Sequence, residues 1–184
     1  MFSPDSAALL LIDVQRGFDD PVWGTRNNPD CEANIARLLA HWQERGGPVV
    51  FVRHNSVEPD SVLHPSRPGN AFQPIIKGDP DVVVTKEVNS AFLGTPRLEA
   101  WLRDRGINEI VVAGIQTNMC CETTARMGGN LGFDVAFVLD ATYTFDLPDP
   151  INGGRIDADT LAGVTAANLQ DEFATVVATD DLTA

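Results

Sequence analysis

Residues 7–14, AALLLIDV, form an apolar run that only Asp13 interrupts. The hydrophobic side chains follow one another without the alternation that burial on one face produces. A short run of this kind predicts a strand that is covered on both faces. Sheets buried on both faces are built from parallel strands joined by helices. The run therefore predicts an α/β protein with a parallel sheet.

Strands and helices are expected to alternate along the rest of the chain. Apolar runs predict further strands at 48–54, 81–86, 108–114, 133–140 and 174–179, and amphipathic stretches predict helices at 31–46, 95–106, 118–131 and 157–173. Asp30 is expected to cap the first helix, and Thr95 the second, with Pro96 at its first position. We expect one domain over residues 1–184. It would be a Rossmann-like three-layer sandwich, with helices on both faces of a six-stranded, mainly parallel sheet.

The charge and cysteine content exclude several classes of function. The chain of 184 residues has 13 basic and 26 acidic residues, a net charge of −13, which argues against binding to nucleic acid or anionic membranes. Its three cysteines include one adjacent pair, which fits neither a disulfide framework nor a zinc site. The N-terminal apolar run is too short for a signal peptide or a membrane span, so we expect a cytoplasmic protein.

Three predicted strands end at or run into a chemically reactive residue. The first ends at Asp13, the third ends at Lys86, and the fourth leads through Gly114 into the turn that carries Cys120. Ligands of open α/β sheets bind outside the carboxyl ends of the strands, so these side chains are expected to meet. Each has an ordinary structural interpretation: a turn-forming Asp, a solvated Lys and a small buried Cys. Their coincidence at equivalent strand ends favours a site.

Cys120 is the expected nucleophile of this site. At the start of a helix, free N–H groups and the helix dipole favour an anion, and a nearby Lys86 ammonium would favour the thiolate further. Asp13 could take the thiol proton and later return it to a leaving nitrogen.

These residues lie in segments that resemble the isochorismatase-like cysteine hydrolases, and the likeness extends over nearly the whole chain. It is carried by LLLIDVQRGF (9–18), VTKEVNSAF (84–92) followed by Gly94 and Thr95, GIQTNMCCETT (114–124) and GFDVAFVLDAT (132–142). The third segment has the family spacing of Gly, two residues, Thr, two residues and Cys, with another Thr four residues later.

The resemblance implies that Asp13, Lys86 and Cys120 are the family's catalytic triad. It also implies a non-proline cis peptide between Ile115 and Gln116, with an oxyanion hole formed by the N–H groups of Gln116 and Cys120. A homo-oligomer is expected on the same ground, and no cofactor.

The sequence departs from the family pattern in two places. Cys121 replaces the aliphatic residue that usually follows the nucleophile, and we expect it to be a packing residue. The metal-binding nicotinamidase branch has an Asp-x-His pair, but Val52 occupies the Asp position here. His54 and His64 remain without a placed carboxylate, so no metal is expected and nicotinamidase activity is disfavoured.

A small-molecule pocket is expected beside the triad, because aromatic residues follow the motif residues. The candidate substrate contacts are Phe18, Trp23, His54, Phe92, Gln15, Asn89 and Tyr143, with Phe145 as a further aromatic candidate. The long loop at 55–80, rich in Pro, Gly, Ser and Asn, is expected to govern the choice of substrate.

The function predicted from the sequence is cysteine-dependent hydrolysis of a C–N bond in a small amide, lactam or carbamoyl compound, through a thioester. Hydrolysis of a vinyl ether such as isochorismate is one alternative, because it needs acid catalysis and no thiol. A non-catalytic oligomeric interaction module is the other.

Overall fold

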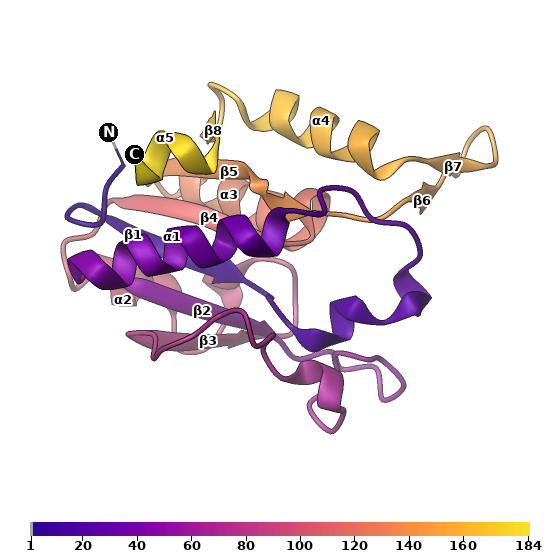
Figure 1. The fold of residues 1–184 in the computed structure, drawn as a ribbon, viewed down its shortest axis with the longest axis horizontal. Coiled ribbons are helices and arrows are strands. Elements are labelled where there is room, and N and C mark those ends of the chain that lie inside the picture. The colour runs from indigo at the N-terminus through magenta and orange to yellow at the C-terminus, as the bar shows by residue number, and fades with distance from the viewer. Residues whose placement is uncertain (1) are drawn as a thin grey trace.

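A single six-stranded sheet forms the centre of the protein (Figure 1). The computed structural model describes residues 2–184. The sheet order is β3-β2-β1-β4-β5-β8, and every pair of neighbouring strands is parallel. The strands are β1 (Ala7–Ile12), β2 (Val49–His54), β3 (Val82–Lys86), β4 (Glu109–Ile115), β5 (Asp134–Tyr143) and β8 (Thr175–Val177). The predicted α/β fold class is confirmed.

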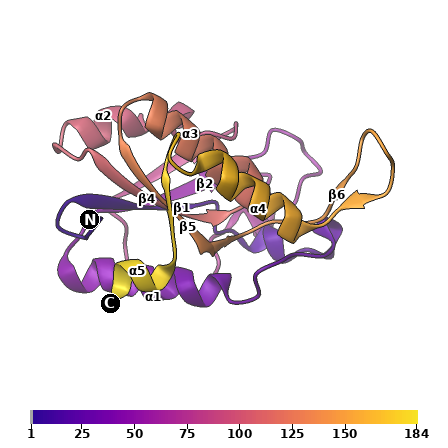
Figure 2. The same cartoon turned by 90° about the horizontal axis from the view of Figure 1, so that it is seen from above.

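Helices cover both faces of this sheet, which makes three layers (Figure 2). One face carries α1 (Cys31–Arg45) and α5 (Thr179–Thr183), and the other carries α2 (Leu98–Arg103) and α3 (Glu122–Asn130). A further helix, α4 (Ala158–Leu169), packs beside α3. In the part of the chain that the structure describes, no helix is long and apolar enough to cross a membrane.

The first strand explains why two helical layers are needed. Leu9 and Leu11 of β1 point into the apolar cluster under α1, whereas Leu10 and Ile12 point into the cluster under α2 and α3. All four side chains are fully buried. An apolar run without alternation is stable only when both of its faces are covered, as they are here.

Two predicted helix caps, Thr95 and Asp30, differ from the structure. Thr95 does not cap α2, because its N–H and C=O exchange hydrogen bonds of 2.8 Å with Thr85 at the end of the sheet, and the helix begins at Leu98. Asp30 precedes α1, but its side chain makes no capping hydrogen bond. The helix predicted at 118–131 consists of a π-helical turn, η5 (Thr117–Cys121), followed by α3.

Short elements cluster at the carboxyl edge of the sheet. They include the 3₁₀ turns η1 (Arg16–Asp19), η2 (Pro21–Trp23), η3 (Pro68–Asn70) and η4 (Ala91–Leu93). A hairpin of β6 (Leu147–Pro148) and β7 (Arg155–Ile156) extends past the end of the sheet (Figures 1 and 2).

Candidate active site

Asp13, Lys86 and Cys120 meet at the carboxyl edge of the sheet, after β1, at the end of β3 and after β4. The Lys86 Nζ lies 2.6 Å from Asp13 Oδ2 and 3.3 Å from Cys120 Sγ. The side chains of Asp13 and Lys86 are completely buried, so this ion pair has no direct contact with solvent. The structure therefore brings together the three side chains that the sequence placed at separate strand ends.

Asp13 reaches this position through an unusual backbone conformation. It follows β1 directly with φ 51°, in the left-handed region, which Asp tolerates better than most residues. Its N–H donates to the Val52 carbonyl at 2.9 Å, and its own carbonyl accepts from Gln15 N–H at 2.7 Å. These bonds fix the turn that directs the carboxylate toward Lys86.

Cys120 is placed by a close approach between β4 and β1. Gly114 has φ 130°, and a Cβ on it would lie 2.1 Å from the Ile12 carbonyl oxygen, so only glycine fits. The Ile115–Gln116 peptide that follows is cis. Next comes η5, in which the Cys121 N–H donates to the Gln116 carbonyl at 3.2 Å. Local π-helical turns are frequent at functional sites.

Three threonines tie this turn to its neighbours. Thr117 Oγ1 donates to Thr142 Oγ1 at 2.9 Å, which links η5 to β5. Thr124, four residues after Cys120, accepts the Ala91 N–H at 3.1 Å and so joins α3 to the segment that follows Lys86. Because Thr117 and Thr124 are fully buried, the hydrogen bonds explain why hydroxyl residues flank the cysteine pair.

His54 completes the polar cluster from the end of β2. Its Nδ1 lies 3.2 Å from Lys86 Nζ, and because an ammonium only donates, Nδ1 accepts and the proton of the neutral ring is on Nε2. Burial, with the Lys86 charge, lowers the pKa of His54. Gln15 holds the backbone of His54 on both sides, since its Nε2 donates to His54 O at 3.0 Å and its Oε1 accepts from His54 N–H at 2.8 Å.

The resting state of Cys120 differs from the sequence expectation. Burial and the Asp13 carboxylate raise the pKa of Cys120 to about 12, although Lys86 opposes this rise. The expected helix dipole and Lys86 charge are outweighed, because the lysine charge is already neutralised by Asp13. Cys120 is therefore a thiol at neutral pH, and its proton must leave during the reaction.

One carboxylate oxygen is free to receive that proton. Asp13 Oδ2 is held by Lys86, but Asp13 Oδ1 is buried and has no hydrogen-bond partner among residues 2–184. A ligand atom of Asp13, one of His54 and Cys120 Sγ all lie within 4.8 Å of one another. The Asp13 carboxylate, with one oxygen that has no hydrogen-bond partner, is therefore an available base for the Cys120 thiol.

The same three side chains have the composition of a metal site, but an ammonium already lies among them. Lys86 Nζ is 2.6 Å from Asp13, 3.2 Å from His54 and 3.3 Å from Cys120. A divalent cation there would be repelled by Lys86 and would compete with it for the same lone pairs. The donor set therefore fits the lysine better than a metal.

A pocket of about 450 Å³ opens above Cys120. Of the predicted residues, its lining includes Asp13, Phe18, Trp23, His54, Asn89, Gln116 and Cys120. One wall is aromatic: the Trp23 ring centroid lies 5.1 Å from that of Phe18 and 5.5 Å from that of Phe145. Asn89 Oδ1 lies 4.0 Å from Cys120 Sγ. This combination suits a small ligand with a flat apolar body.

Three predicted substrate contacts lie outside this pocket. Phe92 is buried on the α2/α3 face, where its ring centroid lies 5.5 Å from that of Phe133. Tyr143 is fully buried behind Phe145, and the Arg26 guanidinium lies 3.6 Å from its ring centroid. Gln15 is also fully buried, because both ends of its amide are used to hold His54. Cys121 is fully buried in the α2/α3 core, as expected for a packing residue.

The pocket also contains residues that sequence reasoning missed. Only Leu63 comes from the 55–80 loop, whereas Asp146 and the β6–β7 hairpin residues Leu147, Pro148 and Arg155 join the predicted Phe145 in the lining. The stretch DLPDPINGGRI carries the signal of a hairpin, because Pro, Asn and Gly residues lie between the apolar residues Leu147 and Ile156. Val22 and Met119 complete the lining.

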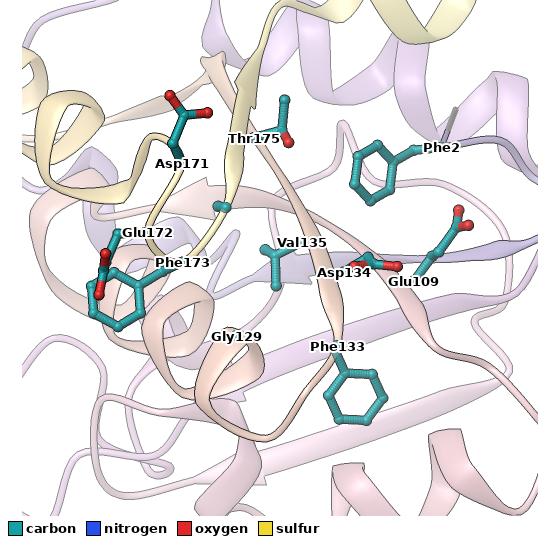
Figure 3. A pocket seen from close by; sticks show the side chains of 11 residues that line it. Phe2, Glu109, Gly129, Phe133, Asp134, Val135, Asp171, Glu172, Phe173 and Thr175 are labelled. Carbon is teal, nitrogen blue, oxygen red and sulfur yellow. The ribbon is translucent and has the colours of Figure 1, made fainter.

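A second hollow of about 540 Å³ lies at the opposite edge of the sheet (Figure 3). Glu109 and Asp134, at the amino ends of β4 and β5, line it together with Asp171 and Glu172. None of its lining residues offers a thiol, an amine or an imidazole. It is separate from the site at Cys120.

Comparisons with known proteins agree with the fold. Residues 7–180 match the family model of the isochorismatase domain. The chain is 44% identical over 179 residues to the isochorismatase family protein YrdC of Bacillus subtilis, covering 97% of this chain and 95% of the relative. It is 35% identical to Nicotinamidase 3 of Arabidopsis thaliana, covering 96% and 86%.

A solved structure shows the same architecture. The crystal structure of an isochorismatase-family protein from Chromobacterium violaceum superposes with a TM-score of 0.91 at 46% identity, covering 98% of this chain and 93% of the other. The six-stranded parallel sheet with helices on both faces is the architecture that this chain shares with isochorismatase-type α/β hydrolases. The chain belongs to the isochorismatase family.

Proposed function

We propose that this protein hydrolyses the C–N bond of a small amide, lactam or carbamoyl compound through a thioester on Cys120. The observation that carries the proposal is the Asp13 carboxylate, which has an oxygen within 4.8 Å of the Cys120 thiol and an unpartnered Oδ1, with Lys86 hydrogen-bonded to both side chains. A base, a nucleophile and a fixed positive charge are the components that acyl transfer requires.

In the first step, Cys120 Sγ attacks the carbonyl carbon while its proton passes to Asp13 Oδ1. The carbonyl π electrons move to oxygen, and the N–H groups of Gln116 and Cys120 stabilise the resulting oxyanion. The raised pKa of Cys120 fits this order, because the proton leaves as the S–C bond forms.

In the second step, the C–N bond breaks and Asp13 returns the proton to the leaving nitrogen, which leaves a thioester on Cys120. Asp13 then takes a proton from water as the water attacks the thioester carbonyl. The carboxylic acid departs, and Cys120 regains its proton. Lys86 holds Asp13 in place between these transfers through its hydrogen bond to Oδ2.

His54 orients the substrate in this proposal. Because Nδ1 accepts from Lys86, the protonated Nε2 of the neutral ring is the donor available to the pocket, which His54 lines. A hydrogen-bond acceptor on the substrate would meet it there. Asn89, within 4.0 Å of Cys120 Sγ, is the second candidate contact for the reacting amide.

The name of one relative, Nicotinamidase 3, is that of an enzyme acting on an amide, and this supports amide hydrolysis as the reaction. The present chain has Val52 where the metal-binding branch has an aspartate, and Lys86 lies among the remaining donors. We therefore propose that the substrate is held without a metal.

A hydrolysis screen tests the proposal. Wild type, Cys120→Ala and Cys121→Ala are assayed on primary amides, lactams, ureido acids and isochorismate. We expect turnover of a C–N substrate by wild type and Cys121→Ala and none by Cys120→Ala. Equal turnover by Cys120→Ala would refute the covalent route, and activity confined to isochorismate would favour acid catalysis by Asp13.

A further inference from the structure

Arg155 brings a positive charge to the pocket from the β6–β7 hairpin. It is the first residue of β7, and it lines the cavity together with Trp23 and Phe145. A Cβ added to Gly24 would be 3.9 Å from Arg155 Nη2, so the guanidinium spans from the hairpin to the end of η2. Its side chain is 54% exposed.

Most of the hydrogen-bonding capacity of Arg155 is unused. A guanidinium has five N–H donors. Among residues 2–184, the only hydrogen bond from this side chain is the one from Nη2 to the Asp146 carbonyl oxygen, at 2.6 Å. Its Nε is 3.9 Å from Asp146 Oδ2, which is beyond hydrogen-bonding distance. Several donors are therefore available to a ligand.

Both carboxylates of the pocket already have partners, and Asp146 forms a long salt bridge with Arg155 itself, with Asp146 Oδ2 at 3.9 Å from Arg155 Nε. Asp146 Oδ1 accepts the Ala158 N–H at 2.9 Å, at the start of α4, where a helix terminus favours a negative charge. Asp13 is neutralised by Lys86. His54 is neutral because its pKa is lowered. Arg155 is thus the charged group of the pocket with free bonding capacity, in a chain with a net charge of −13.

We propose that Arg155 binds a carboxylate at the end of the substrate farthest from the scissile amide. The substrate class is then an amide or carbamoyl compound that also carries an acid group. Its flat or apolar body lies against Phe18, Trp23 and Phe145. This inference rests on the proposed function for the position of the amide, but the charge recognition is a property of the pocket itself. An arginine pairs with a planar carboxylate through two parallel hydrogen bonds.

Equilibrium binding to the Cys120→Ala variant tests this, because it requires neither a thiol nor turnover. The probes are 4-carbamoylbenzoate, 4-methylbenzamide and 4-(aminomethyl)benzamide, which carry an anionic, a neutral and a cationic group on the same ring. Calorimetry should give about tenfold tighter binding of the carboxylate probe than of the methyl probe, equivalent to about 1.4 kcal/mol. The cationic probe should bind more weakly than either.

A second variant identifies the residue responsible. Cys120→Ala combined with Arg155→Gln keeps a donor for the Asp146 carbonyl but removes the charge. It should lose the preference for 4-carbamoylbenzoate and bind 4-methylbenzamide unchanged. The proposal is overturned if the preference survives Arg155→Gln, if both probes weaken equally, or if the carboxylate probe does not bind measurably. If Cys120→Ala prefers the carboxylate probe but wild type hydrolyses no C–N substrate, the proposed reaction is contradicted and the charge recognition by Arg155 stands.

Discussion

Replacing Lys86 with Met tests whether the buried ion pair organises the site. Met keeps most of the aliphatic length of the side chain, so the change removes the ammonium and leaves little cavity. It also removes the hydrogen bonds to Asp13 Oδ2, His54 Nδ1 and Cys120 Sγ, at 2.6, 3.2 and 3.3 Å. The Asp13 carboxylate then remains fully buried without a compensating charge.

The magnitude follows from that burial. Removing one partner of a buried ion pair costs about 3–5 kcal/mol, because the other charge stays desolvated and unpaired. We therefore expect Lys86→Met to lower the free energy of unfolding by about 3–5 kcal/mol at pH 7.

The matched control is Lys77→Met, because the chain has only two lysines and Lys77 is exposed. Urea unfolding at pH 7 gives the free energy of unfolding for both variants and for wild type. Lys77→Met should change it by less than about 0.5 kcal/mol. Lys86→Met should also lose hydrolytic activity, because the ammonium that hydrogen-bonds to Asp13 and Cys120 is gone.

Adding Asp13→Asn to Lys86→Met separates charge from packing. Asn tolerates the left-handed backbone of position 13 and carries no charge. The double variant should therefore be more stable at pH 7 than Lys86→Met alone. A Lys86→Met variant within about 1 kcal/mol of wild type, or a double variant less stable than the single one, would refute the account of the ion pair.

Three further measurements address other parts of the site. The pKa of Cys120 is raised to about 12, so the rate of its alkylation by iodoacetamide should be low at pH 7 and should still be rising at about pH 10. A rate that reaches a plateau below about pH 8 would contradict this. The pKa of His54 is lowered, so the free energy of unfolding should fall as the pH drops below about 6.5. In acid unfolding curves the His54→Gln variant should show a smaller fall than wild type. The same pH dependence in both proteins would contradict a lowered pKa for His54. Gly114→Ala should destabilise the protein by about 3 kcal/mol or more, or prevent folding, because the new Cβ would clash with Ile12. The control Gly163→Ala lies in open space on α4 and should stabilise the protein by about 0.5–1 kcal/mol. Similar melting temperatures for the two variants would show that the approach of Gly114 to Ile12 is not tight.

The layered fold was predictable because hydrophobic patterning fixes it locally. An apolar run such as residues 7–14 is stable only as a strand that is buried on both faces. Because helices lie between such runs along the chain, the strands are joined by helical crossovers and form a parallel sheet. The meeting of Asp13, Lys86 and Cys120 was predictable for the same reason, because carboxyl ends of parallel strands share one edge.

Other parts of the site depend on tertiary contacts that no local pattern encodes. The pKa of Cys120 depends on burial and on which partner neutralises Lys86, so sequence reasoning gave the wrong direction. Phe92 and Tyr143 follow motif residues as closely as Phe18 does, yet packing turns them into the core. Arg155 reaches the pocket through the β6–β7 hairpin, which is not among the elements predicted from the sequence.

The central claim is that the acyl group of the substrate is carried by Cys120. Wild-type protein is mixed with a substrate found in the screen, quenched in acid within one turnover, and examined by intact-mass and peptide mass spectrometry. The account predicts a mass increase equal to the acyl group on the peptide containing Cys120 and Cys121, retained in Cys121→Ala and absent in Cys120→Ala. Full turnover by Cys120→Ala, with no acyl adduct on the wild-type protein under single-turnover conditions, would contradict it.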